Sequence, residues 1–296
     1  MFVGLPVIPT EIFARLPDAY RLAHVETEWS RSRGGGGLHS FLEGPAFDAE
    51  GTLWCVDLAH GRIFRVSPAG EWSLFQQYAG RPNGLKIAAD GRIVVADAIC
   101  GILSFDPRTA ERRCVLAEYG GQKLQGPNDL TFAANGDLYF TDPGSSDLRR
   151  RDGRVFRIRG DGRVELLLDG LAYPNGLVLS PGQDVLYITV TSALQVLRLG
   201  LRPDVVGRHK CGVFLQLSGG LAGPDGITVD PAGNVYVAHS GLATVWQFDR
   251  CGEPLARLRS CTGVRTTNLA LSPDGKHAYI TESETGTILR ARLATP

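Results

Sequence analysis

The chain has 296 residues, of which 43% are hydrophobic and 21% are charged, a composition typical of folded globular proteins rather than disordered ones. Its 31 lysines and arginines balance 31 aspartates and glutamates, so the formal net charge is zero. Proteins that bind nucleic acids or anionic membranes usually carry a basic excess, and we therefore expect neither partner.

Cysteine usage and the first residues indicate a cytoplasmic location. The six cysteines are scattered and form neither a Cys-x-x-Cys pair nor a zinc-binding spacing, so free thiols in a reducing compartment are expected. The start of the chain has no basic residues and contains two prolines, unlike a signal peptide. No apolar run approaches the roughly 20 residues that span a bilayer.

Residues 1–40 form an N-terminal segment with three predicted features. Residues 10–16 show weak helical periodicity, whereas residues 21–28 alternate in hydrophobicity as a strand does. Residues 29–40 contain four consecutive glycines, which makes this stretch a candidate lid.

Residues 41–296 contain six copies of a repeat at intervals of about 40 to 50 residues, which is typical of propeller blades. Each copy has a turn motif that continues into an apolar strand, and a second strand then follows a tight turn. One residue of the turn motif is equivalent in all six copies, and these six are Glu43, Asn83, Asn128, Asn175, Asp225 and Asn268.

The last repeat is incomplete, since it contains only three predicted strands, at residues 268–272, 277–281 and 287–293. A fourth strand from residues 21–28 would remove the exposed sheet edges. We therefore predict one all-β domain over residues 1–296, a six-bladed β-propeller closed by pairing of an N-terminal strand with the last blade. Residues 1–40 supply the closing strand and the candidate lid, and residues 41–296 supply the blades.

Propeller geometry brings the six equivalent residues together at one mouth of the central channel. Two carboxylates and four amides form an oxygen-rich group that suits a hard divalent cation, calcium foremost, with magnesium, manganese, zinc and iron(II) as alternatives. The competing explanation is a repeated turn, because Asn-Gly and Asp-Gly are turn formers. Glu43 favours the metal site, because glutamate is a poor turn residue and its longer side chain suits a ligand.

Other residues at the same mouth are candidates for contact with a substrate. His60 and His239 end second strands there, where they could bind a substrate or shuttle protons. The loop that carries Arg149, Arg150 and Arg151 overhangs this mouth, either attracting an anionic substrate or forming a solvated basic loop.

Four phrases of the sequence resemble the regucalcin (senescence marker protein)–gluconolactonase family of six-bladed propellers: LEGPAFDAEGTLWCVD, PNDLTFAANGDLYFTDP, YPNGLVLSP and GPDGITVDPAGNVYVAH. The resemblance covers residues 41–293 and implies a hydrolase that opens a small-molecule lactone with one divalent metal ion in the channel. It implies metal ligation by Glu43, Asn128, Asn175 and Asp225. Asn83 and Asn268 would then line the pocket as amides that contact the substrate.

Within that reaction, Asp225 is the expected catalytic residue: it is the candidate general base, because its carboxylate would lie beside the attacking water, and direct attack by the carboxylate is the alternative. Two positions depart from family patterns. Animal-type members that act on sugar acids carry an arginine two positions before the third-blade asparagine, where this chain has Gly126. Organophosphate-hydrolysing relatives bind a second calcium ion through an aspartate and a histidine, where this chain has Thr228 and Ala270, so one metal ion is expected.

Two other functions remain open. A phosphotriesterase-like hydrolase could use the same metal site, since a fold does not determine a reaction. A non-catalytic NHL-type binding propeller would share the strand and turn pattern, but it would need no carboxylate at the mouth of its first blade. Glu43 therefore favours an enzyme over a binding module.

Overall fold

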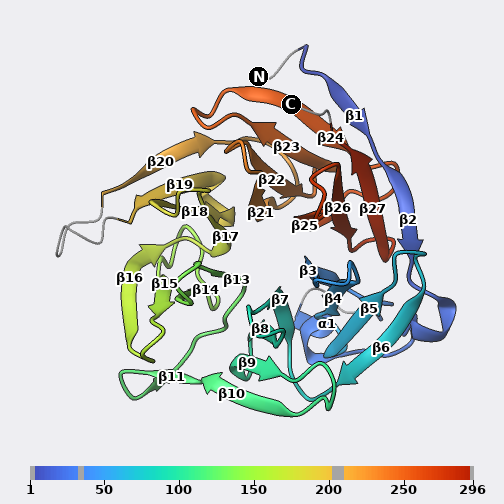
Figure 1. The fold of residues 1–296 in the computed structure, drawn as a ribbon, viewed down its shortest axis with the longest axis horizontal. Coiled ribbons are helices and arrows are strands. Elements are labelled where there is room, and N and C mark those ends of the chain that lie inside the picture. The colour runs from blue at the N-terminus through green and yellow to red at the C-terminus, as the bar shows by residue number, and fades with distance from the viewer. Residues whose placement is uncertain (1–3, 33–36, 202–209, 294–296) are drawn as a thin grey trace.

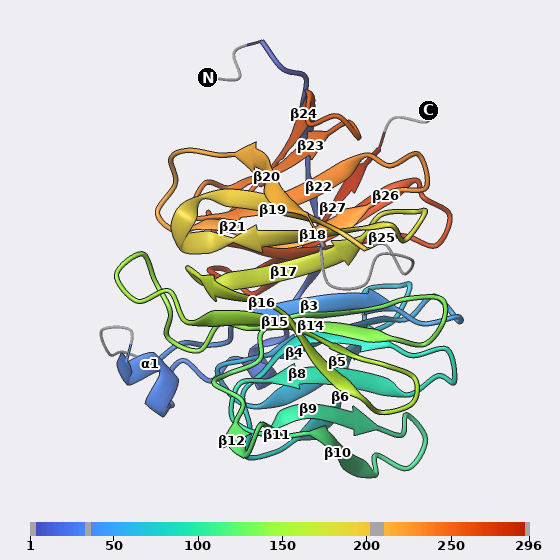
Figure 2. The ribbon, with the colours of Figure 1, turned by 90° about the vertical axis from the view of Figure 1, so that its left-hand side faces the viewer.

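The computed structural model describes residues 4–32, 37–201 and 210–293, in which six β-sheets of four or five strands are arranged around a central axis (Figure 1, with the side view in Figure 2). Each sheet is a blade whose first strand lies nearest the axis and whose fourth lies at the periphery. The predicted all-β six-bladed propeller is confirmed. No helix in the described part of the chain is long and apolar enough to cross a membrane.

The blades follow one another in chain order, with four strands contributed by each of the first five repeats. Blades one to three consist of β3 (Leu42–Phe47), β4 (Leu53–Asp57), β5 (Arg62–Val66) and β6 (Trp72–Gln77); β7 (Pro82–Ile87), β8 (Ile93–Asp97), β9 (Gly101–Phe105) and β10 (Arg112–Leu116); and β13 (Leu130–Phe132), β14 (Leu138–Asp142), β15 (Gly153–Ile158) and β16 (Val164–Leu171). Blades four to six consist of β17 (Pro174–Leu179), β18 (Val185–Val190), β19 (Gln195–Gly200) and β20 (Cys211–Gln216); β21 (Gly223–Val229), β22 (Val235–Ser240), β23 (Thr244–Phe248) and β24 (Pro254–Arg259); and β25 (Thr266–Leu271), β26 (His277–Glu282) and β27 (Thr287–Arg292). A short ribbon of β11 (Glu118–Tyr119) and β12 (Gln122–Lys123) lies between blades two and three.

The ring is closed by an N-terminal strand, as predicted, but that strand is not residues 21–28. β2 (Glu11–Arg15) pairs antiparallel with β27 and completes blade six, after β1 (Val7–Pro9) has added a parallel fifth strand to blade five (Figure 1). The weakly helical stretch at residues 10–16 is thus the closing strand. Pairing with an existing sheet outweighs the weak helical propensity of so short a segment.

Residues 21–28 are excluded from the sheet by local turns and a helix. Val25 N–H donates to the carbonyl of Leu22 at 2.8 Å, and α1 (Glu28–Ser32) begins directly afterwards. Thr27 caps this helix, because its hydroxyl oxygen accepts from Ser30 N–H at 3.1 Å. The candidate lid is described only in part, since residues 33–36 lie outside the described residues.

The hydrophobic core is divided into six main clusters, each between two neighbouring blades. Alternate residues of a strand point to opposite faces of its sheet. In β8, Ile93 and Val95 pack toward blade one, whereas Val94 and Ala96 pack toward blade three. Both faces of a blade are therefore buried, which explains the continuous apolar runs in the sequence.

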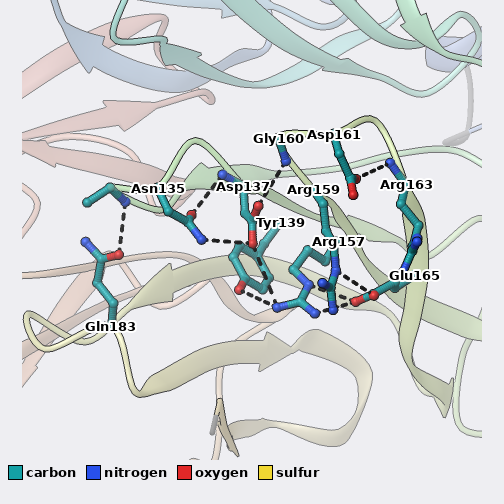
Figure 3. Close-up of polar contacts among 11 residues, drawn as sticks. Asn135, Asp137, Tyr139, Arg157, Arg159, Gly160, Asp161, Arg163, Glu165 and Gln183 are labelled. Atoms are coloured by element: carbon teal, nitrogen blue, oxygen red, sulfur yellow. Dashed lines mark hydrogen bonds and ion pairs between the residues drawn. The ribbon is translucent and has the colours of Figure 1, made fainter. Parts of the chain in front are cut away.

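A polar network lies in blade three at the end of the blade opposite the ring residues, and a hydrogen bond beside it reaches blade four. Arg157 donates to Glu165 and lies 3.8 Å from Asp137, which stands at the start of β14 (Figure 3). Gln183 of blade four accepts from Ala134 N–H of blade three at 2.9 Å. This network supports the joint between the two blades and lies away from the candidate site.

Candidate active site at the channel mouth

The residues Glu43, Asn83, Asn128, Asn175, Asp225 and Asn268, here called the ring residues, lie at irregular points of the innermost strands. In blade two, pairing with the second strand shifts between Pro82 and Leu85, and equivalent shifts occur in blades one, four, five and six. Such β-bulges insert an additional residue and reorient the side chains beside it. The bulge explains how one sequence position in these five blades can serve the channel instead of the sheet, whereas Asn128 of blade three lies ahead of β13, whose pairing with β14 is regular.

Burial separates the ring residues into two kinds. Glu43 and the four asparagines are buried, with between 3% and 9% of their surface exposed. Asp225 is half-buried. It is thus the carboxylate of the ring that solvent, and by extension a substrate, can reach from the mouth.

Glu43 lies in an acidic environment that it shares with Asp225 and Asp129. Burial raises the pKa of the Glu43 carboxyl well above its usual range, and repulsion from Asp225 and then Asp129 raises it further. Burial also raises the pKa of Asp129, although the positive charge of Lys86 opposes this rise. No ion-pair partner of Glu43 or Asp129 lies within 4.0 Å among the described residues. The channel therefore holds negative charge that the described side chains leave largely uncompensated.

The amide side chains show which of their atoms are free to bind something in the channel. Asn175 donates through Nδ2 to the Thr191 hydroxyl at 3.1 Å, which leaves its carbonyl oxygen as an acceptor. Asn268 instead donates to Glu43 and to Asp129, while its own oxygen accepts from Leu269 N–H at 2.8 Å. The side chains of Asn83 and Asn128 make no hydrogen bond to any described residue. Asn268 thus positions the carboxylates of Glu43 and Asp129, whereas the side-chain oxygens of the other three asparagines are available to bind a group in the channel.

Asp129 is the residue at this site that the sequence analysis missed. In blades one, two, four and five a glycine follows the ring residue, whereas in blade three Asp129 stands there. The neighbouring glycine of blade two makes room for it, because a Cβ at Gly84 would collide with Oδ1 of Asp129. An aspartate at a repeat position that is glycine in four other blades was the sequence signal that could have identified Asp129 as a site residue.

The two candidate histidines have different surroundings. His60 bonds through Nε2 to the carbonyl of Leu38 at 2.7 Å and so faces the N-terminal segment. His239 is fully buried, with Nε2 bonded to the carbonyl of Gly219 at 3.0 Å and Nδ1 accepting from Trp246 at 3.2 Å. Because indole N–H can only donate, His239 is neutral with its proton on Nε2. Both of its ring nitrogens are occupied by the protein, which leaves neither for a substrate.

A second set of carboxylates stabilises the loops around the mouth. These residues, here called the strand-ending acids, occupy the last position of the second strand in four blades and are Asp57, Asp97, Asp142 and Glu282. In blades one, two and six each accepts a backbone N–H from the residue directly before the innermost strand, as in Phe41 N to Asp57 Oδ1 at 2.7 Å, whereas Asp142 accepts from Gln125 and Gly126 in the segment ahead of β13. They connect the start of the first strand to the end of the second, and so hold the ring residues in place.

The donor atoms at the ring fit a hard divalent cation. No three His, Cys, Asp or Glu side chains of the described residues form a group that could hold a metal ion alone, so amide oxygens are needed as well. Glu43 and Asp225 supply charge, and Asn128 and Asn175 supply amide oxygens without competing partners. A cation would offset the repulsion among the buried acids, and an all-oxygen donor set suits calcium better than softer metals.

Comparison with known proteins shows what this chain resembles. The model of the SMP-30/gluconolactonase/LRE-like region matches residues 41–293. A gluconolactonase of Zymomonas mobilis subsp. mobilis is 33% identical over 229 residues, which cover 72% of this chain and 63% of that relative, slightly less than two thirds of its length. A lactonase drp35 of Staphylococcus epidermidis is 27% identical over 226 residues, which cover 73% of this chain and 69% of the relative.

Solved structures confirm the fold. A gluconolactonase from Xanthomonas campestris superposes with a TM-score of 0.76 at 24% identity, covering 97% of this chain and 95% of the other. A calcium-binding regucalcin from Agrobacterium tumefaciens gives a TM-score of 0.76 at 20% identity, with the same coverage of 97% and 95%. Since the family model spans all six blades, the chain belongs to the SMP-30/gluconolactonase/LRE-like family.

Proposed function

We propose that this protein is a lactonase that uses one divalent metal ion, calcium foremost, to hydrolyse the ester of a small cyclic substrate. The observation that carries the proposal is the buried acidic channel, in which Glu43 and Asp129 have no cationic partner within ion-pair distance among the residues that the structure describes. The names of the gluconolactonase and lactonase relatives support the lactone as the substrate class.

In this proposal Glu43, Asn128, Asn175 and Asp225 hold the metal ion. When bound, a divalent cation supplies electrophilic polarisation of the ester carbonyl. Asp225, the half-buried acid of the ring, accepts a proton from the water that attacks the acyl carbon. The ring C–O bond then breaks and the departing oxygen takes up a proton, which gives a hydroxy acid.

The remaining predicted site residues have supporting roles. Asn83 contacts the substrate through its free amide, whereas Asn268 acts through its hydrogen bonds to Glu43 and Asp129. His60 remains a candidate contact, because only Nε2 has a partner in the described residues. His239 is assigned instead to holding the loop that precedes β21.

The experiment is a panel of lactones assayed after chelator treatment and addition of single divalent metals. We expect the chelated protein to be inactive and one or more metals, calcium first, to restore hydrolysis and raise the melting temperature. A phosphotriester in the same panel tests the alternative hydrolase. Activity that survives chelation would contradict the metal role, and a protein that binds metal but opens no lactone would contradict the lactonase.

The six cysteines are all free thiols in the structure, which supports a cytoplasmic location. Fractionation of cells that express the protein would test this assignment.

A further inference from the structure

In the four blades with a strand-ending acid, one residue at the rim of the mouth donates its backbone N–H to that acid, directly before the innermost strand in blades one, two and six and ahead of β13 in blade three. In blade two this residue is Arg81, whose N–H donates to Asp97 at 2.8 Å and whose carbonyl accepts from Ala98 N–H at 2.9 Å. In blade six it is Arg265, whose N–H donates to Glu282 at 3.2 Å and whose carbonyl accepts from Ser283 N–H at 3.0 Å. We call this the rim position.

In blades one and three the rim position holds no arginine. Phe41 occupies it in blade one and Gly126 in blade three, with the same backbone bonds to Asp57 and Asp142. The rim position is therefore defined by backbone geometry common to these blades, and its side chain is free to vary without loss of the fold.

The four blades place their arginines in complementary ways. In blades one and three an arginine of the third strand pairs with the strand-ending acid, Arg62 with Asp57 and Arg154 with Asp142, each at 2.5 Å. In blades two and six the facing third-strand residues are Gly101 and Thr287, neither of which is charged.

The strand-ending acids of blades two and six are nevertheless satisfied without an arginine side chain. Asp97 accepts from the Tyr78 hydroxyl at 2.9 Å and from the backbone of Ile99 and Cys100. Glu282 accepts from the backbone of Glu284 and Thr285 and from the Thr285 hydroxyl. Neither acid needs the guanidinium that lies at the rim of its own blade.

Arg81 and Arg265 consequently have guanidinium groups without a protein partner. Neither side chain makes an ion pair within 4.0 Å or a hydrogen bond with any described residue. Blades two and six both pack against blade one, where β3 contacts β7 and β25, so the rim positions of Arg81 and Arg265 belong to the two blades on either side of the blade that carries Glu43.

We propose that Arg81 and Arg265 determine substrate specificity by binding an anionic group, so that the natural substrate is a lactone that carries an acidic group in addition to its ester. The proposal rests on the lactonase function. A guanidinium matches the two oxygens of a carboxylate or phosphate through paired N–H donors. An anionic substrate would otherwise be repelled by Glu43, Asp129 and Asp225, and two arginines at the rim oppose that repulsion while the ester faces Asp225.

The test compares kcat/KM for three lactones: neutral glucono-δ-lactone, a sugar lactone with a free carboxylate, and one with a phosphate. We expect the wild-type protein to prefer an anionic lactone, and the comparison of the two anions identifies which group is bound. Arg81→Gln and Arg265→Gln should each lower kcat/KM for the preferred anionic lactone about tenfold or more and leave the neutral lactone unchanged. Arg81→Lys should recover part of the loss, because it keeps the charge but not the paired donors.

Arg149→Gln is the matched control, because Arg149 is exposed on the loop between β14 and β15 at this mouth but is not at a rim position. An equal loss in this variant would mean that only general positive charge matters and would overturn the proposal. Equal hydrolysis of neutral and anionic lactones by the wild type would also overturn it. The proposal would also be overturned if the Arg81 and Arg265 variants changed the affinity for calcium but not the preference for anionic over neutral lactones.

Direct binding separates this proposal from the lactonase itself. The ring-opened dicarboxylate is titrated into the calcium-loaded wild type and the two Gln variants by calorimetry. If no lactone is hydrolysed but the dicarboxylate binds about tenfold more weakly to the variants, the lactonase fails and the anion site stands. If lactones are hydrolysed but the dicarboxylate binds equally to all three proteins, the anion site is rejected and the lactonase function stands.

Discussion

Glu43 and Asp129, here called the channel acids, and the strand-ending acids lie at the same mouth and are buried, yet their charges are compensated differently. Asp57 is fully buried and accepts from Arg62 and from the backbone of Phe41 and Ala59. Glu43 is almost as buried, but it has two acids as neighbours and a raised pKa. A buried carboxylate with its own cation serves the fold, whereas one without is prepared to bind a cation.

The first and largest effect is expected from breaking a compensated acid. Asp57→Ala leaves Arg62 buried without its partner, and its side chain is only 3% exposed. We expect the free energy of unfolding to fall by about 3–5 kcal/mol, as measured by denaturant titration. Asp274→Ala is the control, since that acid pairs with Lys276 at the exposed surface and should change stability little. Equal losses in both variants would show that the buried pair has no special role.

Loss of Asp225, the proposed base, should affect turnover and not the fold. Asp225→Asn keeps an oxygen for the metal ion but removes the proton acceptor. We expect kcat at saturating metal to fall by roughly 10²-fold or more, with an unchanged denaturation midpoint in chelator. Measurement at several metal concentrations separates lost occupancy from lost chemistry. Turnover at the wild-type level would show that another group is the base.

Glu43→Gln tests the difference between the two sets of acids. Most substitutions of buried residues lower the melting temperature, whereas this one should raise it in the metal-free protein. The neutral amide removes an uncompensated charge, so the melting temperature of the metal-free protein should rise. Calcium at 100 times its Kd stabilises the wild type by about 2.7 kcal/mol, and this increment should largely disappear in the variant. Differential scanning calorimetry with calcium and with chelator measures both changes. A metal-free variant that melts below the wild type would contradict the comparison.

The smallest expected effect concerns His239, which is buried without an acid partner. Burial lowers the pKa of its imidazole below the usual 6.5, so the unfolded chain takes up a proton first as the pH falls. Stability contributed by the neutral ring is therefore complete above about pH 6.5 and is lost below it. His239→Gln should remove up to one proton from the uptake on unfolding, measured from melting temperatures between pH 5 and 8. Its lactone turnover should remain substantial, because neither ring nitrogen faces the channel.

Much of the fold could be predicted because each blade repeats the same local information. Strand length, tight turns and spacing are properties of neighbouring residues, and six copies average out local ambiguity. The closing strand was misassigned because it has no copy for comparison. Residues 10–16 and 21–28 both have patterns of moderate strength, and only the sheet edge at β27 selects between them. The cap formed by Thr27 and Ser30 was a local signal for the helix that excludes the second segment.

At the site, the repeat pattern was enough to predict which residue types lie at the mouth, because equivalent turn positions of the six repeats are arranged around one axis in a propeller. It did not determine how those side chains are compensated. That Asp129 joins the channel, that Asn268 donates to two acids and that the Arg81 guanidinium has no partner in the described part of the chain all depend on atoms from different blades. Charge compensation falls steeply with distance and with exposure to water, and both are set only when the blades close into a ring.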